Sequence, residues 1–271
     1  MHRNLGRLDG PVLLFGGPVS NLQATSSLLA QADAWSIPAE HRICTGDVTA
    51  YCGAPAQTVD LIRERDVIVV AGNCEKQLAS EAEGCGCGFE DGSTCDRLSA
   101  AWYAYANKAV GPDARRWMST CPDIVSFYHQ GARYAMIHGG LTDVARFVWP
   151  VSGPEVFAEE WHAIEVAIGP VDHVIAGHCG LPFQKTTAQG NWINPGVIGL
   201  PPNDGGQQTR FAVLDGGEVL FHRLTYDVDS AYASMVNAGL TQGYHTALRS
   251  GYWPSEDVLP ETLRAPSLAR G

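Results

Sequence analysis

Four residues that could bind a metal ion follow short apolar stretches of this 271-residue sequence. Asp47 and Asn73 each follow a glycine, His138 precedes two glycines, and His178 follows Gly177. A carboxylate, an amide oxygen and two imidazoles together suit a divalent ion such as Mn²⁺, Fe²⁺ or Zn²⁺. Each residue taken alone is also an ordinary turn or structural residue, so the metal hypothesis requires that the fold bring all four together.

The apolar stretches before these residues predict strands that end near one another. Their alternation with helical patterns indicates an α/β layered protein, in which ligands bind where loops leave the carboxyl ends of strands. The expected strands are Pro11 to Phe15, Arg42 to Thr45, Asp66 to Ala71, Val125 to Tyr128, Arg133 to Ile137, His173 to Ala176, Thr209 to Leu214 and Glu218 to Arg223, the last two forming a hairpin. The expected helices are Asn21 to Ala30, Thr58 to Arg63, a stretch carrying Leu98, Trp102, Tyr103 and Tyr105, and a tail from Asp227 to about Ser250.

The segment from Ser80 to Thr120 differs from the rest because it begins with a Gly/Cys-rich loop, and it predicts an insert over the sheet edge. Cys85, Cys87 and Cys95 do not have the spacing of a zinc ribbon. We expect free thiols here, with a disulfide or a separate metal site as the alternatives. The aromatic residues of the following helix fit ordinary helix packing better than a substrate pocket.

The charge of the chain excludes some classes of partner. The formal net charge is −11 and no cluster of Lys and Arg occurs, whereas nucleic-acid binding requires a basic face. A small phosphorylated molecule can still bind to an acidic protein when a metal ion supplies the positive charge. The chain has no apolar stretch long enough to span a membrane, and Met1 to Pro11 lacks the apolar core of a signal peptide, so we expect a cytoplasmic protein.

The order of the motifs resembles the metal-binding signature of the calcineurin-like metallophosphoesterases. The motifs are Gly46-Asp47, Gly72-Asn73, His138 and Gly177-His178, and the resemblance extends over roughly residues 11 to 225. It is strongest to the branch of bacterial phosphodiesterases and diadenosine tetraphosphatase-like proteins. It implies a four-layer α/β/β/α sandwich at 1–225 with the insert at about 80–120, followed by a C-terminal tail at 226–271 that packs on the core.

Enzymes of this family hold two metal ions side by side, about 3.5–4 Å apart. Mapped onto this chain, the ligand set for one ion is complete: Asp47, Asn73, His138 and His178. The ligand set for the other ion lacks three members. Where the family has an Asp, a first His and a last His, this chain has Gly17, Val19 and Gly180. The resemblance therefore implies one divalent metal ion (Mn, Fe or Zn), with the second site lost.

One further catalytic position departs from the family pattern. The resemblance implies a His after the Gly-Asn pair, where this chain has Cys74, and a thiol with a free pKa near 8.5 is a poor substitute for imidazole at neutral pH. Cys74 and Cys179 could face the site, although buried thiols are more often small hydrophobic residues. Arg146 could contact a phosphate, and for Glu75, Asp143 and Arg146 alike a solvated surface role is equally consistent with the sequence.

The function that this pattern indicates is hydrolysis of a small phosphate ester at an altered, mononuclear metal site. The catalytic candidates are Asp47, Asn73, His138 and His178, acting through the metal, together with Cys74. The alternative is a catalytically inactive descendant that binds a phosphorylated ligand, a metal or a partner protein. A third possibility is different metal or thiol chemistry that uses Cys74 and Cys179.

Overall fold

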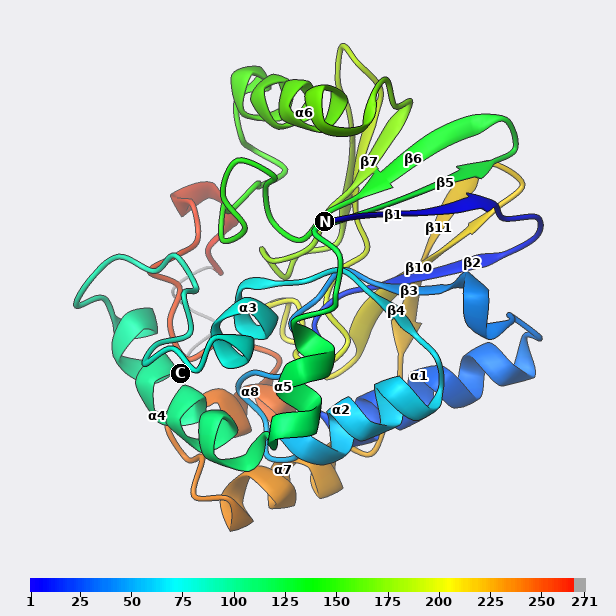
Figure 1. The fold of residues 1–271 in the computed structure, drawn as a ribbon. Coiled ribbons are helices and arrows are strands. Elements are labelled where there is room, and N and C mark those ends of the chain that lie inside the picture. Colours follow the sequence, from blue (N-terminus) through cyan, green and yellow to red (C-terminus); the bar gives the residue numbers. More distant parts are fainter. Residues whose placement is uncertain (266–271) are drawn as a thin grey trace.

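The structure is a computed structural model, and residues 1–265 of the chain are described. Two mixed sheets pack face to face, and helices cover the outer face of each (Figure 1). The six-stranded sheet has the order β1-β5-β6-β7-β9-β8 and the five-stranded sheet the order β11-β10-β2-β3-β4. The predicted α/β/β/α sandwich is confirmed.

The strands are short, as expected for a sandwich whose loops carry the polar residues. They are β1 (His2–Arg7), β2 (Val12–Phe15), β3 (Arg42–Cys44), β4 (Ile68–Val69), β5 (Ile124–His129), β6 (Ala132–Met136), β7 (His173–Ile175), β8 (Phe183–Thr186), β9 (Asn191–Asn194), β10 (Thr209–Asp215) and β11 (Glu218–Leu224). The α-helices are α1 (Leu22–Ala34), α2 (Pro55–Glu64), α3 (Asn73–Ala79), α4 (Thr94–Ala109), α5 (Pro112–Met118), α6 (Pro154–Ile168), α7 (Val228–Asn237) and α8 (Tyr244–Ser250).

The central strands are apolar on both sides because both of their faces are buried. In β2, Leu13 and Phe15 belong to the core beneath the helices, whereas Val12 and Leu14 belong to the core between the two sheets. Alternate side chains of a strand point to opposite faces, so a strand buried on both faces is apolar throughout. This is why the central strands could be predicted from short apolar stretches.

The helices divide between the two outer faces. Helix α6 alone lies over the six-stranded sheet, where Phe157, Trp161 and Ile164 pack against strand residues (Figure 1). Helices α1 and α2 lie under the five-stranded sheet, and α7 contacts α1 and α8. The helical tail is therefore two helices separated by a turn that contains Gly239 and Gly243. The division into a domain, an insert and a tail at the expected boundaries stays a prediction.

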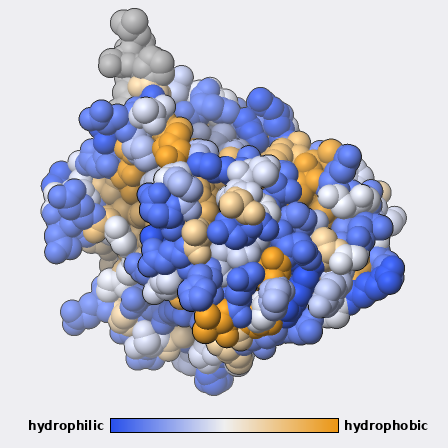
Figure 2. All heavy atoms as spheres, turned by 90° about the horizontal axis from the view of Figure 1, so that it is seen from above, coloured by the Kyte–Doolittle hydropathy of each residue, from blue (hydrophilic) through white to orange (hydrophobic). Residues whose placement is uncertain are grey.

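Seen from above, polar side chains cover most of the molecule, and apolar ones gather only in small separate patches (Figure 2). Within residues 1–265, no helix has the length and hydropathy needed to cross a bilayer.

Candidate functional site

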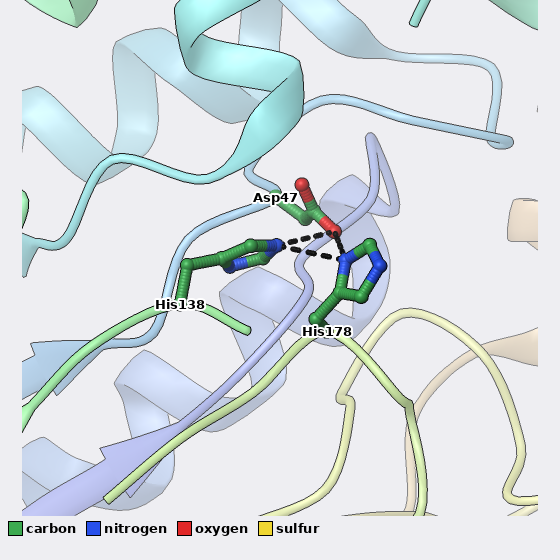
Figure 3. Close-up of side chains that lie close together, drawn as sticks. All are labelled: Asp47, His138 and His178. Carbon is green, nitrogen blue, oxygen red and sulfur yellow. Dashed lines mark hydrogen bonds and ion pairs between the residues drawn. The ribbon is translucent and has the colours of Figure 1, made fainter. Parts of the chain in front are cut away.

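The four predicted ligands meet where strands of the two sheets end. Asp47 follows β3 and Asn73 follows β4 in the five-stranded sheet, whereas His138 follows β6 and His178 follows β7 in the six-stranded sheet. Asp47, His138 and His178 point toward one another across the sandwich (Figure 3). Three of their donor atoms lie within 4.8 Å of one another.

Three donor atoms lie around His138 Nε2 at distances close to those within one coordination shell. His138 Nε2 lies 3.1 Å from Asn73 Oδ1, 3.1 Å from His178 Nδ1 and 3.3 Å from Asp47 Oδ2. His178 Nδ1 lies 4.0 Å from Asp47 Oδ2. Ligand atoms that all lie about 2.1 Å from one ion, in tetrahedral or octahedral geometry, are roughly 3.0–3.4 Å apart. The three distances from His138 Nε2 fall in this range, whereas the distance between His178 and Asp47 is longer.

Neighbouring groups fix which atoms face the centre of this cluster. His138 Nδ1 lies 2.6 Å from the carbonyl oxygen of Thr45, so Nδ1 carries a hydrogen and a neutral ring presents a lone pair at Nε2. The Asn73 amide nitrogen donates to the carbonyl oxygen of Cys85 at 3.0 Å, which turns its Oδ1 inward. Electron-rich atoms thus converge, and such an arrangement is stable only when a proton or a cation lies between them.

The charges in the cluster are strongly coupled. Burial favours a neutral Asp47, but the adjacent His138 outweighs it and lowers the pKa of the carboxyl to about 2. Burial also opposes protonation of His138, yet the Asp47 carboxylate raises the pKa of this imidazole above its ordinary value. Burial and the neighbouring His138 lower the pKa of His178 to about 4. Asp47 is thus an anion at neutral pH and His178 is neutral, which are the states that bind metal.

The backbone at two ligand positions is strained. Asp47 has φ of 56° and His178 has φ of 61°, the left-handed region that few residues other than glycine adopt. In addition, Asp47 Oδ1 is buried without a hydrogen bond of normal geometry. Strain and unsatisfied polar atoms of this kind are concentrated at functional sites.

The Glu75 carboxylate holds two of the ligand loops together. It is fully buried and accepts hydrogen bonds from the backbone N–H groups of Asp47, Val48 and Gly72 at 2.8, 2.8 and 2.9 Å. The surface role considered for Glu75 is therefore wrong. A glutamate in the first turn of a helix that opens with glycine is a possible sequence signal for this role, because such a side chain can cap the helix.

An apolar cavity of about 70 Å³ adjoins Asp47 and His178. Its other walls come mainly from aromatic and aliphatic side chains, including Tyr51, Phe147 and Trp253. Gly17, Val19 and Gly180 also line it. The three positions at which the resemblance implies missing metal ligands therefore lie together at one side of the cluster.

Comparison with known proteins identifies the family. Residues 20–218 match the Calcineurin-like phosphoesterase superfamily domain. The chain belongs to the calcineurin-like phosphoesterase superfamily. This confirms the family that the order of the motifs predicted.

The relatives of this phosphoesterase-superfamily chain are distant in sequence. It is 21% identical over 243 residues to the uncharacterized protein MJ0912 of Methanocaldococcus jannaschii, covering 82% of this chain and 90% of that protein. The crystal structure of a metallophosphoesterase from Sphaerobacter thermophilus has a TM-score of 0.68 at 18% identity, covering 90% of this chain and all of that one. The hypothetical protein PH1004 of Pyrococcus horikoshii OT3 has a TM-score of 0.70 at 14% identity, covering 90% and 98%. At these identities the structures establish the fold alone.

In this superfamily member, apolar side chains border two of these positions, Gly17 and Gly180. A Cβ atom added at Gly17 would lie 2.6 Å from Val197 Cγ1, and one added at Gly180 would lie 3.3 Å from Trp253 Cζ2 and 3.6 Å from Val197 Cγ2. Val197 therefore reaches both positions, and the tail residue Trp253 covers one of them. Apolar side chains therefore border two of the positions at which the resemblance implies missing ligands.

The cysteines differ in part from the expectation. Cys85 and Cys87 form a disulfide, so the prediction of free thiols is wrong for these two, whereas Cys95 is a free buried thiol. The Asn73 amide nitrogen lies 3.4 Å from Cys87 Sγ, which places the disulfide directly behind this predicted ligand. Local spacing gave no reason to connect the Gly/Cys-rich loop with Asn73.

Cys74 and Cys179 are both buried next to the cluster. The Cys74 thiol interacts with the Asp47 carboxylate and helps to lower its pKa. Burial and this carboxylate raise the pKa of Cys74 well above its ordinary value, so the thiol stays protonated. Cys179 lines the apolar cavity, and its sulfur lies 3.2 Å from the Asn194 amide nitrogen.

The remaining candidates have structural partners. The Arg146 guanidinium contacts the carboxylates of Glu159 and Glu160 at 2.8 and 2.7 Å, so two anions already neutralise it. Trp102 and Tyr103 lie in the core beneath the five-stranded sheet, as helix packing predicted. Asp143 is exposed.

Proposed function

We propose that this protein is a metal-dependent phosphoesterase that acts on a small phosphate ester with one divalent ion. Asp47, Asn73, His138 and His178 would hold the ion. The observation that carries the proposal is the convergence of three electron-rich atoms, those of Asn73, His178 and Asp47, within 3.3 Å of His138 Nε2. Membership of the phosphoesterase superfamily supplies the class of substrate.

The donor set suits Mn²⁺, Fe²⁺ or Zn²⁺, because it combines two imidazole nitrogens with two oxygens and contains no thiolate. A bound ion would supply a Lewis acid that polarises a phosphoryl oxygen and makes a water molecule acidic enough to attack phosphorus. Without a partner ion, half of the usual charge stabilisation is lost, so we expect rates lower by orders of magnitude than those of two-metal relatives.

Each residue contributes a separate property. Asp47 supplies the only negative charge among the four ligands. The Thr45 carbonyl group orients His138, and the Cys85 carbonyl group orients Asn73, which pre-organises both donors. His178 stays neutral because its pKa is about 4, and it therefore offers a lone pair at physiological pH.

Cys74 limits the chemistry that the site can perform. Because its thiol is buried and protonated, it neither removes a proton from water nor readily donates one to a leaving group. The proposed enzyme should thus prefer esters whose leaving group departs without protonation.

The alternative function is a binding protein that descends from an enzyme. The observation that favours it is that apolar side chains border the positions of the missing ligands: Val197 and Trp253 lie against Gly17 and Gly180. Such a protein would bind metal and a phosphorylated ligand at the same four residues without turnover.

The metal content of protein purified without added metal tests the proposal. We expect at most one ion per chain, and hydrolysis of 4-nitrophenyl phosphate or bis(4-nitrophenyl) phosphate that a chelator abolishes and Mn²⁺ restores. One bound ion with no hydrolysis of either ester supports the binding protein. Absence of any bound ion after incubation with Mn²⁺, Fe²⁺ and Zn²⁺ in turn overturns both functions.

A further inference from the structure

The walls of the cavity beside Asp47 and His178 differ sharply in polarity. On one side lie the charged and imidazole groups of the proposed metal site. Phe147 packs against His178 with ring centroids 4.4 Å apart, and Tyr51 packs against Tyr244 at the same separation. Val197 and Val258 add aliphatic surface. A ligand that fills this space must therefore be polar at one end and apolar at the other.

The tail forms a fixed wall of the cavity. The Trp253 indole nitrogen donates to the carbonyl oxygen of Pro201 at 2.7 Å, and its backbone N–H donates to Asn203 Oδ1 at 2.8 Å. The Asn203 amide nitrogen donates in turn to Glu256 at 2.7 Å. These bonds anchor the tail on both sides of the indole ring, so the shape of the cavity is set before a ligand binds.

The apolar walls exclude ligands that carry many hydroxyl groups at this position. Seven of the lining side chains offer no hydrogen-bonding atom: Val19, Phe89, Phe147, Val197, Leu200, Pro201 and Val258. The indole N–H of Trp253 is already bonded to Pro201, and the hydroxyl of Ser255 already accepts from the backbone of Asp257. Sugar hydroxyls buried here would lose their hydrogen bonds to water without replacement, which is costly. The volume of about 70 Å³ limits the enclosed part of a ligand to a small group, since one water molecule needs roughly 10–15 Å³ by this measure.

From these observations we infer that the cavity binds a small apolar group, a single aromatic ring, esterified to the phosphate that the metal site holds. Within the proposed function, this makes the substrate class an aryl phosphate ester, and the inference rests on that function. The cavity at Gly17, Val19 and Gly180, where metal ligands are proposed to be lost, would thus bind the apolar group of the ester. Val197, Val258 and Phe147 act as specificity-determining residues.

Binding of two phosphonates by the Mn²⁺-loaded protein tests this inference without relying on turnover. Phenylphosphonate and methylphosphonate offer the same head group and differ in the apolar substituent. Titration calorimetry should give a Kd about 10- to 100-fold lower for phenylphosphonate, because burying a ring contributes about as much as burying an aromatic side chain. The comparison in the wild-type protein needs no variant and so does not depend on whether a variant folds.

Val258→Thr keeps the shape of the wall and adds a hydroxyl group. It should therefore reduce the ratio of the Kd for methylphosphonate to the Kd for phenylphosphonate about threefold to tenfold. Val156→Thr is the matched control, since it makes the same change at a half-buried valine in α6 that packs in the core beneath this helix and does not line the cavity. Equal affinities for both phosphonates would overturn the inference and leave the metal site standing. Failure of both phosphonates to bind would overturn the inference together with the proposed function.

Discussion

Glu75 and Asp47 are joined by a hydrogen bond of 2.8 Å from the backbone N–H of Asp47 to the Glu75 carboxylate. The same carboxylate accepts from Gly72 at 2.9 Å, so one buried side chain sets the distance between the loop that carries Asp47 and the loop that carries Asn73. Glu75→Gln should weaken Mn²⁺ binding about 10- to 100-fold, because supports of metal ligands have effects of this size. Calorimetric titration of both proteins measures the change.

The matched control for this prediction is Glu160→Gln. Glu160 is equally buried and also accepts from backbone N–H groups, those of Leu141 and Thr142, but it does not connect two ligand loops. Both variants should lose about 1–3 kcal/mol of unfolding free energy, measured in urea, because a buried hydrogen-bond network is broken. Equal losses of Mn²⁺ affinity in the two variants would contradict the positioning role of Glu75.

Replacing Asp47 tests the proposed ligand set directly. Asp47→Asn removes the only formal negative charge among the four donors at almost no change in shape. Metal affinity should fall by more than about 100-fold, since even residues that only support a ligand have effects of up to that size. Any esterase activity should disappear with the metal.

The fold should survive this change, because a chain of 271 residues does not need an ion to hold its core. Circular dichroism and urea unfolding check the fold, and elemental analysis checks the metal. Asp33→Asn is a suitable control at an exposed acidic residue whose partners are Arg42 and Arg65. If metal content and activity both persist in Asp47→Asn, the site lies elsewhere in the protein.

The disulfide behind Asn73 gives a third prediction. Asn73 is held by the carbonyl oxygen of Cys85 and contacts the sulfur of Cys87, so the joined loop keeps its amide oxygen turned toward His138. Cys85→Ser together with Cys87→Ser should loosen this loop and weaken Mn²⁺ binding about tenfold. Cys121→Ser, which changes a buried free thiol outside the cluster, should leave the affinity unchanged. An unchanged affinity in the double variant would show that the loop does not position Asn73.

The ligand cluster could be predicted from the sequence because each member comes two to four residues after the end of a strand that contains a short apolar run. Such strands are visible as short runs, and the first polar residue after each run lies at the edge of its sheet. Strand β1 was not predicted, because this mostly exposed edge strand pairs with β5 through its backbone and has no apolar alternation. Helix α6 was also missed.

The surroundings of the site could not be predicted, because they depend on contacts between distant segments. Glu75 is buried only because the backbones of Asp47, Val48 and Gly72 converge on it. Val197 and Trp253 reach Gly17 and Gly180 from positions far along the chain. The sequence predicts which ligands are missing, but it does not indicate which side chains border those positions.

Val197 and Trp253 lie where new side chains at Gly17 and Gly180 would have to fit. They therefore limit whether restoring the family ligands can create a second metal site. Gly17→Asp, Val19→His and Gly180→His would introduce the three missing ligands, and Cys74→His would add the missing imidazole. A side chain at Gly17 would meet Val197 at 2.6 Å, and one at Gly180 would meet Trp253 at 3.3 Å. Overpacking costs about 1–3 kcal/mol at each such site, so we expect a less stable protein that still binds at most one ion.

A second ion should bind only when the side chains of Val197 and Trp253 are also made smaller. Adding Val197→Ala and Trp253→Leu to the four changes removes the groups that lie against Gly17 and Gly180, and calorimetric titration with Mn²⁺ should then approach two ions per chain. The pair Val197→Ala and Trp253→Leu alone is the control and should bind one ion, because it adds no ligand. Two ions in the variant that keeps Val197 and Trp253 would mean that these side chains move aside readily. Such a result would contradict the hypothesis that the side chains of Val197 and Trp253, in addition to the missing ligands, prevent a second ion from binding.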